Sequence, residues 1–186
     1  GRQATNMNTK TFGDRKITIR KLTKNDLKIV DKFKYFINSF VQENAKLSMN
    51  KKIDTNGEKI FLNNQLRSIK LKNKVYIVAE CGNEIVGTTG IELEKWRKNH
   101  IGTFGIAIAN GYRGAGLGKY LMAEIIKLAK KDLNPKPKFI QLEVYANNKP
   151  AIGLYKKLGF KIVAKLPKQL QWKGKLIDEL IMMRKI

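Results

Sequence analysis

The sequence contains almost no cysteine or histidine, since Cys81 and His100 are the single residues of their kinds among 186. A lone cysteine cannot form an internal disulfide, which favours a reducing, cytoplasmic setting. One histidine and one cysteine supply no ligand set for zinc, so we expect no metal. Long apolar runs are also missing. No run approaches the ~20 residues that cross a bilayer, and we expect no membrane partner.

Acidic residues are scarce, with 15 Asp and Glu against 38 Lys and Arg, which gives a net charge of +23. A field of this sign attracts polyanions, so proximity to ribosomes or nucleic acid is one expectation. The basic residues are spread along the chain without a run typical of a tail or arm. Charge therefore leaves open whether the excess is functional or a compositional bias, and a nucleic-acid-binding module stays an alternative.

Length and a hydrophobic content of 42% are typical of one globular domain. We expect residues 1–12, which begin with Gly rather than Met, to be a disordered tail or a remnant of cloning, and residues 13–186 to be a single domain. Period-two alternation predicts strands at 16–22, 75–80, 84–93, 100–109, 139–145, 160–166 and 176–184. Helical spacing predicts helices at 25–41, around 60–69, at 117–128 and at 148–158. This is an α/β (α+β) pattern whose hairpins exclude a purely parallel sheet.

A glycine-rich turn lies between a predicted strand and an amphipathic helix, and it reads Arg113-Gly114-Ala115-Gly116-Leu117-Gly118-Lys119. Alternate glycines permit positive φ angles and close backbone approach. Several N–H groups and the helix N-terminus can then face one anion, and the two flanking cations add formal charge. The turn therefore predicts a phosphate or pyrophosphate site. The Walker and dinucleotide-binding spacings both fail here, and a tight turn without a ligand is the alternative.

The spacing Arg-x-x-Gly-x-Gly resembles the acetyl-CoA pyrophosphate loop of the GNAT superfamily of N-acetyltransferases. A second block, residues 142–160, is similar to the next GNAT block, with these residues in register: Asn148, Ala151, Leu154, Tyr155, Gly159 and Phe160. Both blocks occur in order, about thirty residues apart, and the resemblance covers roughly residues 73–166. It is closest to the protein-acetylating branch, which includes the ribosomal-protein N-terminal alanine and lysine acetyltransferases.

The resemblance implies a mixed, mostly antiparallel central sheet of about 6–7 strands, with helices on both faces. Two parallel neighbours, ending near Ala109 and beginning near Phe139, would splay apart to form the acetyl-CoA cleft. The resemblance also implies the residues that bind acetyl-CoA: backbone of Ile106, Ala107 and Ile108 at the pantetheine, amides of Arg113, Gly114, Ala115, Gly116, Leu117, Gly118 and Lys119 at the pyrophosphate, and Asn148 and Tyr155 beside the pantetheine arm.

The resemblance further implies catalytic roles for three residues. Tyr155 would be the general acid for the departing thiolate. Glu143 would be the general base, with Glu92 as the alternative and a water relay from either left open. An incidental core tyrosine and surface carboxylates are the competing interpretations.

The implied reaction moves the acetyl group of acetyl-CoA to a primary amine and releases coenzyme A. The expected acceptor is a protein N-terminus or a lysine. It would bind between the chain that joins the first predicted strand to Val75 and the connection Pro167–Lys175. We expect the protein to be a monomer or a homodimer. Acetylation of a small amine (a polyamine, an aminoglycoside or an amino-acid derivative) and a catalytically inert GNAT-like sensor remain alternatives.

Overall fold

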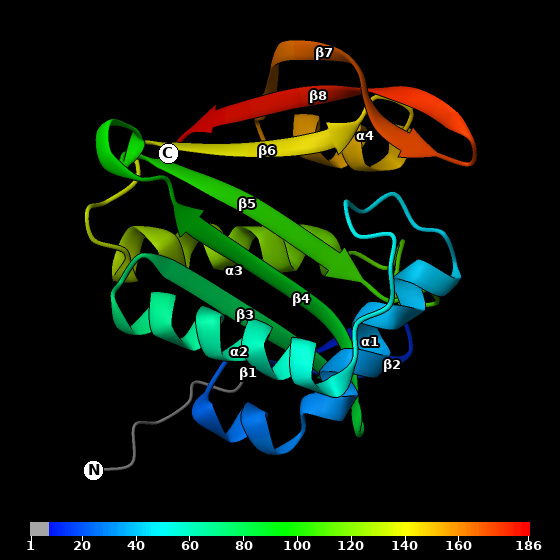
Figure 1. The fold of residues 1–186 in the computed structure, drawn as a ribbon. Helices are drawn as coiled ribbons and strands as arrows, with labels where there is room; N and C mark the ends of the chain where they lie inside the picture. The colour runs from blue at the N-terminus through cyan, green and yellow to red at the C-terminus, as the bar shows by residue number, and fades with distance from the viewer. Residues whose placement is uncertain (1–7) are drawn as a thin grey trace.

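The computed structural model describes residues 8–186, which form one eight-stranded mixed sheet with helices on both faces (Figure 1). The strands are β1 (Asn8–Phe12), β2 (Arg15–Lys21), β3 (Lys74–Cys81), β4 (Glu84–Leu93), β5 (Ile101–Ile108), β6 (Phe139–Tyr145), β7 (Lys161–Trp172) and β8 (Lys175–Lys185). The helices are α1 (Val30–Gln42), α2 (Thr55–Lys70), α3 (Leu117–Asp132) and α4 (Lys149–Lys157), with short 3-10 turns η1 (Lys24–Lys28) and η2 (Trp96–Lys98). The strand order is β1-β2-β3-β4-β5-β6-β8-β7. The α/β prediction is confirmed, although eight strands exceed the predicted 6–7.

The additional strand is β1, so the prediction that the domain begins at residue 13 was wrong for residues 8–12. This strand pairs antiparallel with β2, from Asn8 opposite Ile19 to Phe12 opposite Arg15. Phe12 is buried and packs edge-on against Tyr120, with ring centroids 5.5 Å apart. An edge strand with a single buried side chain carries no apolar alternation, which is why the pattern missed it. The rest of the predicted tail, residues 1–7, lies outside the described residues.

Two other elements differ from the predicted bounds. The helix predicted at 25–41 is divided into η1 and α1, because Asp26 accepts a hydrogen bond from the Thr23 amide (2.8 Å) and is drawn into an ion pair with Arg20 (2.6 Å). The strand predicted at 160–166 runs on to Trp172, past a register shift between Leu166 and Leu170. Most of β7 is exposed, so alternation gave no signal for its second half.

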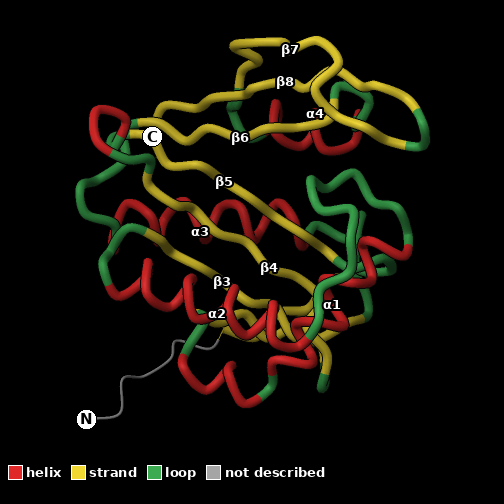
Figure 2. The backbone as a smooth tube through the Cα atoms, in the orientation of Figure 1, coloured by secondary structure: helices red, strands yellow, loops and turns green. Residues whose placement is uncertain are grey.

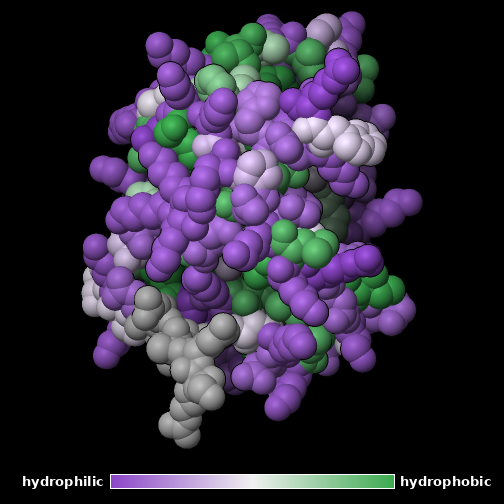
Figure 3. All heavy atoms as spheres, turned by 90° about the vertical axis from the view of Figure 1, so that its left-hand side faces the viewer, coloured by the Kyte–Doolittle hydropathy of each residue, from purple (hydrophilic) through white to green (hydrophobic). Residues whose placement is uncertain are grey.

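The two sheet faces are covered by different helices. Helices α1 and α2 pack on one face, where Phe33 and Leu62 share a core with Val78 of β3 (Figure 2). Helix α3 packs on the other face, where Leu121 and Ile125 are fully buried. Helix α4 packs on the same core, with Tyr155 buried and Ala151 and Ile152 partly buried. In residues 8–186 no helix is long and apolar enough to cross a membrane. The face drawn in Figure 3 is covered mostly by hydrophilic side chains.

The sheet opens between its only two parallel neighbours within residues 8–186, β5 and β6. Their ladder covers only Ile101–Thr103 against Phe139–Gln141. Beyond Thr103, β5 keeps its antiparallel partner β4 but has no partner on the other side, and Figure 1 shows β6 diverging from it. The predicted splay is therefore present. It leaves backbone N–H and C=O groups of β5 free to bind another chain or a ligand.

Candidate active site at the split between β5 and β6

A cleft of about 1950 Å³ lies at the split. It is larger than the 300–1,000 Å³ typical of a small-ligand pocket, so it has room for two substrates. The cleft is lined from one half of the sheet by α1, β4 and β5, and from the other by β6, α4 and β8. Among the residues predicted from sequence, the lining includes Ile106, Ala107, Ile108, Arg113, Gly114, Gly116, Gly118, Lys119, Glu92, Glu143, Asn148 and Tyr155.

The glycine-rich turn has the geometry of an anion site. Gly114 and Gly116 adopt φ angles of +82° and +90°, and no heavy atom lies within 4 Å of a β-carbon built on either. Gly116 is the N-cap of α3, and the first helical donor bonded back to it is the Tyr120 amide (3.1 Å). The amides of the first turn of α3 therefore have no intrahelical acceptor. These free donors and the positive end of the helix dipole can hold a phosphate.

Gly118 is required for a different reason. A β-carbon there would lie 3.1 Å from Cδ1 of Ile108 and 3.5 Å from Cδ2 of Leu154. This glycine lets α3 approach both β5 and α4. Two members of the predicted turn contribute only backbone or loop shape: the Leu117 side chain is fully buried in the core, and Ala115 is exposed outside the cleft lining.

The Arg113 side chain, which the sequence predicts to add positive charge at the phosphate, is bonded to other parts of the protein. Its Nε donates a hydrogen bond to the Ile108 carbonyl (2.7 Å), and its guanidinium forms an ion pair with Glu43. These contacts tie the turn to the end of β5 and to α1. Lys119 is exposed at the cleft and forms no ion pair with residues 8–186, so it is the more available cation for a phosphate.

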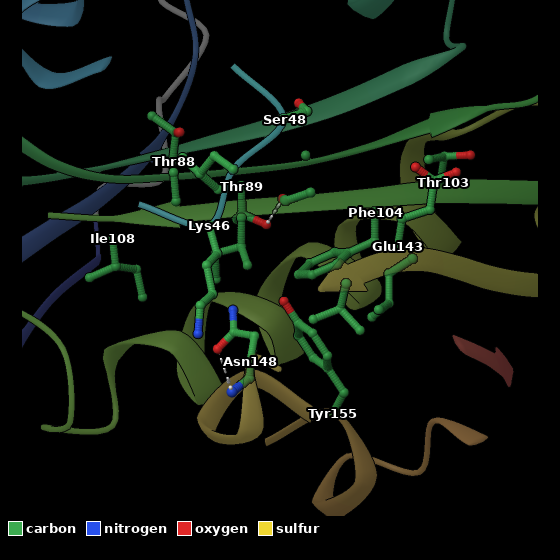
Figure 4. A pocket seen from close by; sticks show the side chains of 18 of the residues that line it. Lys46, Ser48, Thr88, Thr89, Thr103, Phe104, Ile108, Glu143, Asn148 and Tyr155 are labelled. Carbon is green, nitrogen blue, oxygen red and sulfur yellow. Dashed lines mark hydrogen bonds between the residues drawn. The ribbon is translucent and has the colours of Figure 1, made fainter. Parts of the chain in front are cut away.

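Helix α4 positions two of the predicted residues. The Asn148 side chain caps the helix by accepting from the Ala151 amide (3.5 Å), and it also lines the cleft. Tyr155 is 8% exposed and packs edge-on against Phe104, with ring centroids 6.2 Å apart. Figure 4 shows the Tyr155 side chain projecting from α4 into the pocket. Burial raises its pKa to about 12, so the phenol keeps its proton at neutral pH.

The two candidate bases have different surroundings. The Glu92 carboxylate is paired with Lys74 Nζ (3.0 Å) and accepts from Ser68 Oγ (3.3 Å). Glu143 is exposed on β6 and has no ion pair or side-chain hydrogen bond with residues 8–186. Strand pairing puts both on one sheet face, because Glu92 is opposite Thr103 and Thr103 is opposite Gln141, two residues before Glu143.

Trp172, in the connection predicted to form one wall of the acceptor site, lines the cleft, whereas sequence reasoning missed Tyr145 and Glu179, which line it too. Trp172 donates from Nε1 to the Asn44 carbonyl (2.9 Å), and Tyr145 donates from its hydroxyl to the Leu47 carbonyl (3.1 Å). These bonds fasten the loop after α1 to the opposite half of the sheet. Alternation along the last strand could have assigned Glu179 to a face, but the neighbours of that face depend on strand order.

No group of three or more His, Cys, Asp or Glu within the described part of the chain could hold a metal ion. The cleft brings together a buried phenol and a carboxylate without an ion pair among residues 8–186, next to free backbone donors and an anion-binding turn, and this set of groups is suited to acid–base chemistry.

Known proteins with the same features provide the comparison. The Acetyltransferase (GNAT) family matches residues 44–160. The L-amino acid N-acetyltransferase AaaT of Escherichia coli is 31% identical over 109 residues, 58% of this chain and 66% of AaaT. An N-alpha-acetyltransferase of Sulfurisphaera tokodaii is 35% identical over 107 residues, 51% of this chain and 61% of that protein. The matches thus span slightly less than two thirds of these relatives.

The fold is shared with yncA of Salmonella typhimurium, which was solved with its cofactor acetyl-CoA. The TM-score is 0.74 at 20% identity, over 91% of this chain and 93% of that chain. The family match covers more than half of the sequence and contains the glycine-rich turn, the split strands and all of α4. The chain belongs to the GNAT acetyltransferase family.

Proposed function

We propose that the protein is an acetyl-CoA-dependent N-acetyltransferase whose acceptor is a primary amine, foremost the N-terminal amine or a lysine of a protein. The observation that carries this proposal is the combination in one cleft of an unpaired carboxylate, Glu143, and a buried phenol, Tyr155, beside the anion-binding turn. Acetyl transfer from a thioester to an amine needs a base, an acid and a stabilised carbonyl oxygen.

The residues of the cleft fit acetyl-CoA. The free edge of β5 at Ile106, Ala107 and Ile108 can pair with amide groups of the pantetheine arm as an added strand would. The open space over Gly114 and Gly116, with Lys119 nearby, suits a diphosphate. Bound there, acetyl-CoA supplies the activated acetyl group. One free β5 amide, most simply that of Ile108, would then donate a hydrogen bond to the thioester carbonyl.

Glu143 is the better candidate for the base. An amine is mostly protonated at pH 7, and the base must take a proton before the nitrogen attacks. Glu92 is anchored by Lys74 at 3.0 Å, so protonating it would break an ion pair. Glu143 has no such partner among residues 8–186 to lose, and it can accept the proton directly or through one water.

Tyr155 is suited to return a proton to the sulfur of coenzyme A. Burial raises its pKa to about 12, which keeps it protonated at neutral pH, so its hydroxyl can donate a hydrogen bond to the sulfur and pass a proton to it as the C–S bond breaks. Asn148, at the start of the same helix, fixes the orientation of α4 by capping it.

The names of the two curated relatives support an α-amine as the nucleophile, since one acts on L-amino acids and the other on N-terminal α-amines. A net charge of +23 favours a protein acceptor with anionic surroundings such as a ribosome. Small-amine acetylation is the second candidate, favoured by the name of the E. coli relative.

The test is thiol release from acetyl-CoA with panels of peptides, free amino acids, polyamines and aminoglycosides, together with calorimetry of acetyl-CoA binding. We expect binding, and turnover with peptides. Binding of acetyl-CoA without acetylation of any amine would indicate a catalytically inert GNAT-like sensor. Absence of acetyl-CoA binding, with steeply salt-dependent binding of nucleic acid, would overturn the proposal in favour of a nucleic-acid-binding module.

A further inference from the structure

Two carboxylates in the cleft have neither an ion pair nor a side-chain hydrogen bond with residues 8–186, although the chain carries 38 Lys and Arg against 15 Asp and Glu. They are Glu143 of β6 and Glu179 of β8. In so basic a chain, two neighbouring carboxylates that pair with none of its cations among residues 8–186 indicate a binding site for a cationic ligand.

Strand register places the two side chains together. Glu179 is directly opposite Tyr145, which lies two residues after Glu143 on the neighbouring strand. Residues opposite each other, and residues two apart on one strand, share a face. The two glutamates are therefore diagonal neighbours on one face, about 7–8 Å apart at their backbones. Burial and the charge of Glu143 both raise the pKa of Glu179, which agrees with this proximity.

Three charged groups of the cleft have partners of their own. Glu92 is held by Lys74 at 3.0 Å, and Glu94 accepts a hydrogen bond from Thr103 Oγ1 (2.8 Å). Lys46, from the loop after α1, donates to the Asn147 carbonyl (3.0 Å) and lies over the Trp172 ring at 4.7 Å. These contacts direct the nearby charges away from the Glu143–Glu179 pair.

A second and independent observation points to a ligand at the same place. Tyr155 is only 8% exposed and lines the same cleft, and its side chain makes no hydrogen bond with residues 8–186. Figure 4 shows it directed into the pocket that Glu143 also lines. Its hydroxyl reaches the cleft without a partner from residues 8–186 and is therefore available to a bound molecule.

We infer that Glu179 and Glu143 together form a cation subsite that receives the acceptor as an ammonium ion, with Glu179 as a positioning residue that favours cationic over neutral acceptors. This inference rests on the proposed acetyl transfer. A proton passes from the ammonium nitrogen to the Glu143 carboxylate, and the freed amine forms the new N–C bond. As the C–S bond breaks, the thiolate takes the Tyr155 proton, and the second proton that the new amide nitrogen loses restores the Tyr155 hydroxyl. Glu179 stays ionised and holds the ammonium until Glu143 has removed the proton.

The experiment compares Glu179→Gln with wild type, using the best peptide from the acceptor screen. We expect the KM for the peptide to rise about ten-fold, as for loss of a charge-assisted contact, with kcat within two-fold and unchanged acetyl-CoA binding. Glu179→Asp should recover part of the affinity. Glu124→Gln, on α3 outside the cleft lining, changes net charge equally and should leave the KM unaltered.

A binding readout separates charge from shape. The N-terminally trimethylated peptide carries a permanent cation and cannot be acetylated, whereas the N-acetylated peptide is neutral. Wild type should be inhibited more strongly by the first, and Glu179→Gln should show no preference. An unchanged peptide KM in Glu179→Gln, or equal inhibition of wild type by the two peptides, overturns the subsite. A protein that binds acetyl-CoA but acetylates no amine would instead refute the proposed function.

Discussion

Glu58 offers a stability test that does not depend on the active site. Its carboxyl lies on the inner face of α2, is 4% exposed and has no cationic partner among residues 8–186. Gln65, two turns along the same face, has its Oε1 buried without a hydrogen bond. Desolvation raises the pKa of Glu58 from 4.5 to about 7. The folded protein therefore prefers this carboxyl neutral.

The sign and size of the effect follow from linkage. The pKa is higher in the folded state, so the stabilisation is fully present below pH 4.5. It is lost as the pH rises toward 7, because the folded state then holds a proton that the unfolded state releases. At about 1.4 kcal/mol per pKa unit the loss at pH 8 is about 3 kcal/mol. Glu58→Gln is neutral at every pH and removes this loss.

The assay is urea or thermal unfolding of wild type and Glu58→Gln between pH 4 and 8. The variant should gain about 3 kcal/mol over wild type between these limits, or about 6–10 °C in Tm at pH 8 for a domain of this size. Glu84→Gln, exposed in the β3–β4 hairpin, is the control and should track wild type. Any effect of the amide on packing is the same at every pH. A stability difference that is constant from pH 4 to 8 would refute the reasoning.

Three further predictions concern activity. Tyr155→Phe should slow acetyl transfer about ten-fold or more while the Kd for acetyl-CoA stays unchanged, and unaltered turnover of a weakly nucleophilic amine would remove its role as the acid. Glu143→Gln should lower kcat and raise the pH optimum, whereas Glu92→Gln should mainly loosen the contact to Lys74; identical pH–rate profiles for both variants and wild type would exclude either as the base. Gly116→Ala forces a residue with a side chain to adopt φ +90° at the N-cap of α3, and calorimetry should show acetyl-CoA binding weakened by about 1–2 kcal/mol. Gly82 has φ +59° in a hairpin outside the cleft, and the control variant Gly82→Ala should bind acetyl-CoA as wild type does.

Local signals carried most of the fold prediction. Period-two alternation located β3 and β4, and helical spacing located α3, since both reflect one apolar side facing a core. The same reasoning failed at β1, which buries a single side chain, and at the exposed second half of β7. Where an element buries little, its sequence has no pattern to read, and only its pairing partner holds it in place.

The sequence by itself determined the chemistry-bearing motifs, because a positive φ at Gly116 or a helix cap at Asn148 is a requirement of the local backbone. Tertiary structure alone decided which charges are free. Arg113 is drawn to Glu43, seventy residues away, and Glu143 is left beside Glu179 because β8 pairs with β6. Ion pairing and desolvation depend on groups brought together from distant parts of the chain, and no spacing along one strand encodes them.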